Sequence, residues 1–143
     1  MEAWLALGFL AGMAQALQGA VNAQLRAVVQ SPLWATLLSF VVGTIALGVL
    51  ALAARAPLPA QLPTRAWVWA GGFLGVFHVG AALVLVPKLG AGTTVGLYVA
   101  GQMTLGLLLD HFGFVGVPLH TTTPLRFLGA AMVVAGVLLL RLT

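Results

Sequence analysis

Residues 3–25 read AWLALGFLAGMAQALQGAVNAQL, a stretch without one charged side chain. A helix needs about 20 mainly apolar residues to cross a bilayer, and this segment is long enough. Four more stretches meet or approach that length, at about 33–54, 66–86, 91–109 and 124–142. The connections between them are too short to form a separate soluble domain. The sequence therefore predicts an all-α membrane protein with five transmembrane helices in a single membrane domain, residues 1–143.

The composition supports the membrane assignment and excludes several other classes of protein. Hydrophobic residues make up 62% of the chain and charged residues 6%, whereas soluble domains carry about 25% charged residues. The lysines and arginines stand singly near the ends of the apolar stretches, so the net charge of +4 indicates no nucleic-acid partner. The chain has no cysteine, which excludes disulfides and thiolate metal sites. We expect no metal and no cofactor. Glu2 stands before the first stretch in place of a basic start, and the apolar run is longer than that of a signal peptide, so this segment is expected to be part of the mature protein.

Short motifs between the apolar stretches predict where the chain turns. Residues 30–32, Gln-Ser-Pro, are expected to break the chain and start the second helix, and residues 87–90, Pro-Lys-Leu-Gly, to form a tight turn after the third. Residues 112–118 are too apolar for an ordinary aqueous loop and too short for a span. This linker is either interfacial or re-entrant, or a loop packed on the helix ends, and we favour the packed loop. Asp110 and His111 either gate or couple transport, or form a solvated cap or interfacial ion pair, which we favour.

The basic residues are balanced across the predicted membrane. With five spans, the side that holds the N-terminus carries Arg55, Arg65 and Arg126, and the other side carries Arg26, Lys88 and Arg141. Because lysine and arginine bias sets the orientation of a membrane protein, this balance predicts insertion both ways. Two oppositely oriented copies would then pair about an axis in the membrane plane and form the inverted repeat common among transporters. The alternative is a single topology fixed by Glu2, the α-amino group or the order of folding.

Small and polar residues form a stripe on one face of the first stretch. Gly8 and Gly12 form a G-x-x-x-G pair that permits close helix approach, and the stripe continues through three amides. Polar positions in the next three stretches predict that four helices converge on a polar interior. The residues expected to bind a substrate there are Gln15, Gln18, Asn22, Ser39, His78, Tyr98 and Gln102. The alternative is that small residues only pack the helices together and amides only join them.

His78 is the only ionisable side chain expected deep within a span. An imidazole can relay a proton near neutral pH, and ionisable residues inside a membrane are functional candidates by default. The alternative, a neutral histidine that hydrogen-bonds another helix, is favoured.

Catalysis is not expected, and no catalytic residue is assigned. The sequence contains no G-x-x-x-x-G-K-[ST] motif of nucleotide-driven pumps. An intramembrane protease would need a nucleophile and a base, and Ser39 with His78 lacks a carboxylate to orient the histidine.

Several motifs along the chain support a family resemblance. They are Gln18-x-x-x-Asn22-x-x-Leu25, Ser31-Pro32, Ser39-Phe40-x-x-Gly43-Thr44, Trp69-x-Gly71-Gly72-x-x-Gly75, Pro87-x-x-Gly90, Gly101-Gln102 and Asp110-His111-Phe112-Gly113. With these motifs the chain resembles the small YdcZ-like family of the drug/metabolite transporter superfamily. The resemblance implies a transporter-type architecture in a bacterial inner membrane, with five-helix members acting as antiparallel homodimers, as oppositely oriented pairs of paralogues, or as fused ten-helix proteins. The design also resembles the four-helix small multidrug transporters, but Gln15 and Gln18 stand where those proteins have a central glutamate.

Two classes of function follow from these observations. The first is a dual-topology homodimer, or a pair with an oppositely oriented paralogue, that moves a small polar or amphipathic metabolite by alternating access. The second is a non-transporting membrane binding or scaffold protein, in which amides join the helices and hydrophobic furrows hold lipid. Membrane lipid and a small-molecule ligand are the expected partners, and nucleic acid is not.

Overall fold

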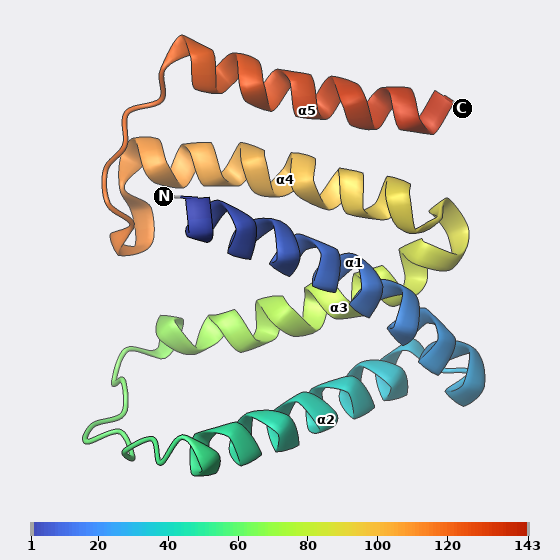
Figure 1. Cartoon of the computed structure of the whole chain (residues 1–143), viewed down its shortest axis with the longest axis vertical. Coiled ribbons are helices and arrows are strands. Elements are labelled where there is room, and N and C mark those ends of the chain that lie inside the picture. Colours follow the sequence, from blue (N-terminus) through green and yellow to red (C-terminus); the bar gives the residue numbers. More distant parts are fainter. Residues whose placement is uncertain (1, 143) are drawn as a thin grey trace. The chain divides into compact units, whose positions relative to one another are not determined.

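The protein is helical throughout the part that the computed structural model describes, which is the backbone of residues 2–142 with side chains through Leu139. No β-strand occurs in this range. In chain order the elements are α1 (Glu2–Val29), α2 (Pro32–Ala53), η1 (Ala66–Trp69), α3 (Ala70–Leu89), α4 (Ala91–Phe112), η2 (Phe114–Gly116) and α5 (Pro124–Leu142) (Figure 1). The predicted all-α class is confirmed.

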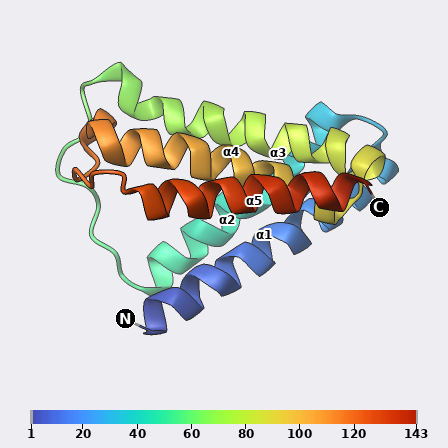
Figure 2. The same ribbon diagram turned by 90° about the horizontal axis from the view of Figure 1, so that it is seen from above.

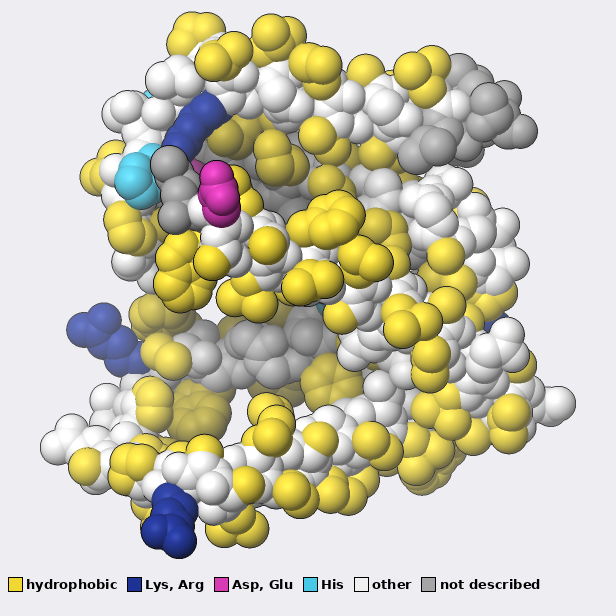
Figure 3. Space-filling view, viewed as in Figure 1, with side chains coloured by type: hydrophobic (Ala, Val, Ile, Leu, Met, Phe, Trp, Pro, Cys, Tyr) yellow, Lys and Arg dark blue, Asp and Glu magenta, His cyan; other side chains and the backbone are white. Residues whose placement is uncertain are grey.

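Four of these helices are long and apolar enough to cross a membrane: α1, α2, η1 with α3, and α4. The described part of α5, Pro124–Leu139, is apolar but shorter. Figure 3 shows the consequence on the surface, where charged side chains are few among hydrophobic ones. The fifth span therefore stays a prediction, and the side chain of Arg141 near its end lies outside the described side chains.

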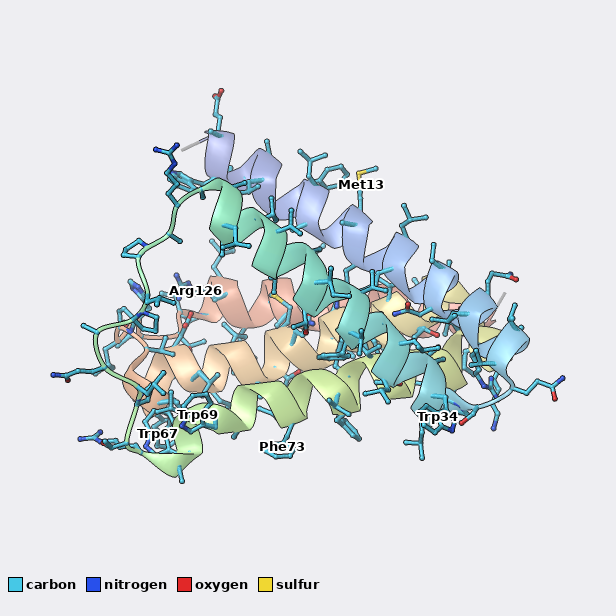
Figure 4. The ribbon with its side chains drawn as sticks, turned by 90° about the horizontal axis from the view of Figure 1, so that it is seen from below. Met13, Trp34, Trp67, Trp69, Phe73 and Arg126 are labelled. Carbon is cyan, nitrogen blue, oxygen red and sulfur yellow. The ribbon has the colours of Figure 1, made fainter. Side chains whose placement is uncertain are left out.

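Tryptophans mark both ends of the first three helices. Trp34 lies at the start of α2, and Trp67 and Trp69 lie in η1 at the start of the third span. Figure 4 shows Trp34 at one end of these helices and the other two at the opposite end. Indole rings concentrate at the two membrane interfaces, so these positions fit helices that cross from one interface to the other.

The chain divides into two compact units, residues 1–88 and residues 89–143, which we call the first and second units. The core of the first unit is formed by Ala35 from α2 with Val79 and Leu83 from α3, and its partly buried neighbours include Leu25 and Val29 from α1. Figure 2 shows α1 and α2 as neighbours, joined by a short connection. Three helices thus share one small apolar core.

The connection between α1 and α2 forms where the sequence predicted a break. Gln30 has a positive φ of 54°, and Ser31 caps α2 by accepting a hydrogen bond from the backbone N–H of Trp34 at 3.4 Å. Pro32 occupies the first turn of α2, where a missing N–H costs no helical hydrogen bond.

Three helices extend further than the sequence predicted. α1 continues to Val29 instead of 25, and α4 continues through Asp110 and His111 to Phe112 instead of ending at 109. The expected tight turn at residues 87–90 is wrong, because α3 runs through Pro87 to Leu89 and only Gly90, with φ of 81°, leaves the helix. Apolar length alone locates the hydrocarbon-crossing part of a helix, not the polar turns that extend it into the interface.

The linker between α4 and α5 folds back onto the end of α4. Gly113 ends the helix in the left-handed conformation, and its N–H donates to the carbonyl of Leu109 at 2.8 Å. The N–H of His120 donates to the carbonyl of Asp110 at 2.9 Å, and the rings of Phe112 and Phe114 stack with centroids 5.3 Å apart. The linker is thus a loop packed on a helix end, the alternative that the sequence favoured.

α4 and α5 form the second unit as a pair of neighbouring helices (Figure 1). Gly96 of α4 faces Val137 of α5 so closely that a Cβ atom on Gly96 would lie 3.0 Å from Cγ2 of Val137. Val137 and Ala130 are buried. In contrast, the predicted close-approach pair Gly8 and Gly12 has no described atom within 4 Å of an added Cβ. Among the glycines of the helices, Gly96 makes the closest approach to a neighbouring helix, and Gly19, Gly75 and Gly80 make looser ones.

The substitution Gly96→Ala should destabilise the second unit. The added methyl group overlaps Val137, and overpacking of this kind costs about 1–3 kcal/mol. Thermal unfolding of the purified protein in detergent measures the effect. Gly101→Ala is the matched control, because it lies in the same helix with open space around its Cβ position and should leave the midpoint unchanged or raise it. Equal midpoints for the two variants would contradict close packing at Gly96.

Candidate functional site

A hydrogen bond between α1 and α3 brings together two of the residues expected to bind a substrate. Nε2 of Gln15 lies 2.9 Å from Nε2 of His78, and both side chains are half-buried. The contact joins α1 to α3 through one amide and one imidazole, and the donor and acceptor roles follow the tautomer of the histidine. The predicted hydrogen bond from His78 to another helix is confirmed, and the neutral state of the histidine stays a prediction.

The polar stripe on α1 is narrower than the sequence predicted. Asn22 is buried at 5% exposure, whereas Gln18 is exposed. At about 100° per residue, Gln15, Asn22 and Arg26 fall within about 40° of one another. Gln18 lies about 60° from Gln15 but only about 40° from Asn22 on the same projection, so its exposure, and not its angle, sets it apart from the other two amides. The structure thus brings Gln15, Asn22 and His78 to one side of α1 and leaves Gln18 exposed.

A second polar link joins α1 to α3 at Arg26, which the sequence counted only as an interfacial charge. Nη1 of Arg26 donates a hydrogen bond to the carbonyl of Leu83 at 3.0 Å. That carbonyl is the one left without its helical donor, because the residue four positions on is Pro87, which has no N–H. The guanidinium replaces the missing donor. The signal in the sequence was the proline inside the helix, whose freed carbonyl requires a partner in a membrane.

The hydroxyl groups in the helices are mostly engaged within their own helix. Thr36 and Thr94 are buried, and their hydroxyls donate to the carbonyls of Pro32 and Gly90 at 2.8 Å. This backward bond satisfies a hydroxyl that would otherwise be unpaired in hydrocarbon. Ser39 is half-buried in α2, and its role in binding stays a prediction.

Tyr98 and Gln102 lie one turn apart in α4 and belong to the second unit. Tyr98 is half-buried, and Gln102 is exposed and lines a pocket between α4 and α5. A single cavity that combines these two residues with those of the first unit stays a prediction.

The pocket of the second unit that Gln102 lines has a volume of about 490 Å³ and carries an ion pair; a second, apolar pocket of about 430 Å³ lies between the same two helices. Nη1 of Arg126, at the start of α5, lies 3.6 Å from Oδ2 of Asp110, in the last turn of α4. The expected interfacial ion pair at Asp110 is therefore confirmed, but Arg126 was not recognised as its partner. The sequence did hold a signal for this pair: Asp110 and Arg126 lie at the two ends of one linker, and a helical hairpin brings residues at such positions together.

A larger groove lies on the first unit and is almost entirely apolar. Its volume is about 700 Å³, and it runs between α2 and α3. Its lining includes Leu37, Phe40, Val76, Phe77 and Leu85. Within the described residues, no group of three or more histidine, aspartate and glutamate side chains is placed to hold a metal ion.

The apolar helices, with polar links between them, define a multi-pass α-helical membrane protein. Residues 3–139 match the family described as "Putative inner membrane exporter, YdcZ". The chain belongs to the YdcZ family, as the sequence motifs predicted. That description names an exporter and not an enzyme.

A curated relative agrees with this assignment. The chain is 43% identical over 56 residues to the inner membrane protein YdcZ of Escherichia coli (strain K12). The aligned part spans 39% of this chain and 38% of the relative. No solved structure matches the chain. The protein is therefore a multi-pass inner membrane protein, and the predicted location is confirmed.

The bond from Arg26 to Leu83 should matter only while residue 87 is proline. Arg26→Gln should lower stability by about 1 kcal/mol, the usual scale of a hydrogen bond between membrane helices. In a Pro87→Ala background the alanine N–H can donate to Leu83, so the same change should have a smaller effect. Thermal or denaturant unfolding of the four proteins gives the coupling free energy. Strict additivity of the two substitutions would contradict the replacement of a missing helical donor by Arg26.

Proposed function

We propose that this chain is a transporter that works as an antiparallel pair and moves a small polar or amphipathic metabolite by alternating access. The pair consists of two copies of the chain in opposite orientations, or of this chain and an oppositely oriented paralogue. Gln15, Asn22 and His78 of the first unit, with Tyr98 and Gln102 of the second, supply the hydrogen bonds to the substrate. Gln18 and Ser39 complete the set of candidate residues.

The observation that carries this proposal is the polar group of Gln15, His78 and Asn22 inside apolar helices. Polar side chains at membrane depth are costly and are usually kept for function. Gln15 and His78 are 2.9 Å apart and only half-buried, so each retains surface for a ligand. Amides and a neutral imidazole suit a ligand that is neutral or zwitterionic, because they offer donors and acceptors without net charge.

The balance of basic residues supports opposite orientations. Three lysines or arginines on each side give no preferred orientation under the positive-inside rule. Two such chains would supply ten helices related by an axis in the membrane plane, which is the inverted repeat of many transporters, with the binding site near the midplane. The family description as an exporter agrees with this function.

The competing proposal is a membrane scaffold that holds lipid without transport. The apolar groove between α2 and α3 favours it, because a furrow of about 700 Å³ lined by Phe40, Phe77 and aliphatic side chains suits an acyl chain. Under this proposal Gln15 and His78 only join two helices, and water does not reach them.

Single cysteines should reveal both orientations of the chain in cells. Pro59→Cys and Thr121→Cys place the cysteines in exposed segments on the side that holds the N-terminus. The neighbouring Thr122 is not used, because its hydroxyl is bonded to the carbonyl of Leu107. An impermeant thiol reagent applied to intact cells should label each to about half of the amount in permeabilised cells, because balanced charges permit both insertions. The chain has no native cysteine to interfere.

Gln30→Cys, on the opposite side, serves as the matched reporter in that experiment. With two orientations it too should label to about half. Complete labelling at positions 59 and 121 with none at 30, or the reverse, would establish one orientation and contradict the homodimer; co-expression with an oppositely oriented paralogue would then be required.

Water should reach Gln15 if the protein transports. Gln15→Cys in membrane vesicles should react with a small charged methanethiosulfonate, because such reagents modify the ionised thiol in water. Met13→Cys is the control, because Met13 is an exposed apolar position of the same helix (Figure 4) and faces lipid in this proposal. Equal lack of reaction at both positions would favour the scaffold.

A further inference from the structure

The pocket of the second unit runs from the membrane interface toward the middle of α4. Gln102 lies near the midpoint of this helix and Asp110 lies in its last turn. Their separation of eight positions corresponds to about 12 Å along the helix axis at 1.5 Å per residue. Val99, Met103 and Leu107 supply apolar walls. The pocket therefore has a charged end, an apolar body and an amide at depth.

Glycines keep this pocket open. Gly106 of α4 and Gly129 of α5 both line it, and a Cβ atom on either would meet no described atom within 4 Å. Neither glycine is thus required for close packing of α4 on α5, in contrast to Gly96. Side chains at these two positions would occupy space that is now part of the pocket.

The ion pair at the charged end is weak and can exchange partners. The 3.6 Å separation is longer than a charge-assisted hydrogen bond of about 2.7–2.9 Å. The side chains of Arg126 and Asp110 are 46% and 34% exposed, and exposed pairs contribute about 0–1 kcal/mol. Asp110 is also one of only two acidic residues in the chain. Little stability is lost if a ligand separates the two groups.

We propose that this pocket binds a zwitterion, a molecule that carries an ammonium group and an acidic group together with an apolar body. The ammonium pairs with Asp110 and the acidic group with Arg126, so each charge of the pocket exchanges one partner for another. A ligand with a single charge would pair with only one of Asp110 and Arg126, whereas a zwitterion pairs with both. The apolar body lies along Val99, Met103 and Leu107, and Gln102 bonds any polar group at the far end.

This inference deepens the proposed function and rests on it for the claim that the ligand is transported. Binding itself does not depend on transport or on orientation, and it is tested separately. The same chemistry occurs in free amino acids with apolar side chains and in the headgroup of phosphatidylethanolamine. The experiment distinguishes these two sources.

The test measures binding to the full chain in nanodiscs of phosphatidylcholine and phosphatidylglycerol. The probes are radiolabelled leucine, isoleucine, valine, methionine and phenylalanine at millimolar concentration in equilibrium dialysis. For the amino acid that binds best, its analogues without the amine or without the carboxylate should bind about tenfold more weakly or worse, a loss of about 1.4 kcal/mol. In parallel, native mass spectrometry measures retention of phosphatidylethanolamine added to the nanodiscs. Amino-acid binding assigns a free zwitterion, and selective lipid retention assigns a headgroup.

Variants locate the binding. Asp110→Asn and Arg126→Gln should each reduce binding of the zwitterion about tenfold or more, and Gly106→Leu should block it by filling the pocket. Gly101→Leu is the matched control, since Gly101 also has open space around its Cβ position but does not line the pocket. The thermal midpoint of each variant shows whether it is folded.

Three results would overturn the proposal. They are failure of all five amino acids and of phosphatidylethanolamine to bind the wild-type protein, equal binding of the singly charged analogues, or unchanged binding in folded Asp110→Asn and Arg126→Gln proteins. The first two need no variant. Cysteine labelling in two orientations together with any of these results would leave the antiparallel transporter standing and remove only this pocket as its zwitterion site.

Discussion

The first unit depends on every backbone carbonyl having a hydrogen-bond donor, and the bond from Arg26 to the carbonyl of Leu83 meets this requirement. In hydrocarbon no water satisfies a backbone group, so each carbonyl must find a donor within the protein. Pro87 removes the helical donor of Leu83, and Arg26 replaces it from another helix. One proline thereby turns a local defect of α3 into a contact with α1. Leu83, fully buried beside Ala35 and Val79, belongs to the same small core.

Polar contacts and close glycine packing matter here because moving apolar side chains from lipid to a helix interface stabilises the fold only weakly. Lipid tails are as apolar as leucine, so membrane helices gain little by hiding aliphatic side chains from them. Most large apolar side chains of this chain are accordingly exposed. What distinguishes one helix arrangement from another is the bond between Gln15 and His78, the bond between Arg26 and Leu83, and the approach of Gly96 to Val137.

The two units present different chemistry to a ligand. The first offers neutral amides and an imidazole between apolar helices, and the second offers two opposite charges at the mouth of a pocket that ends near Gln102. Both sets are balanced in charge. Under the function proposed for this member of the YdcZ family, these groups would suit ligands without net charge.

The sequence by itself determined the all-helical class and located four long apolar helices among its five predicted spans, because apolar length acts locally. It also located Gln15, Asn22 and His78 as polar residues in apolar surroundings. Only the tertiary structure decided that Gln18 is exposed, that α3 continues through Pro87, and that Arg126 pairs with Asp110. These outcomes depend on which helix faces meet. Helical spacing gives the angle of a side chain around its own axis but not the direction of the neighbouring helix.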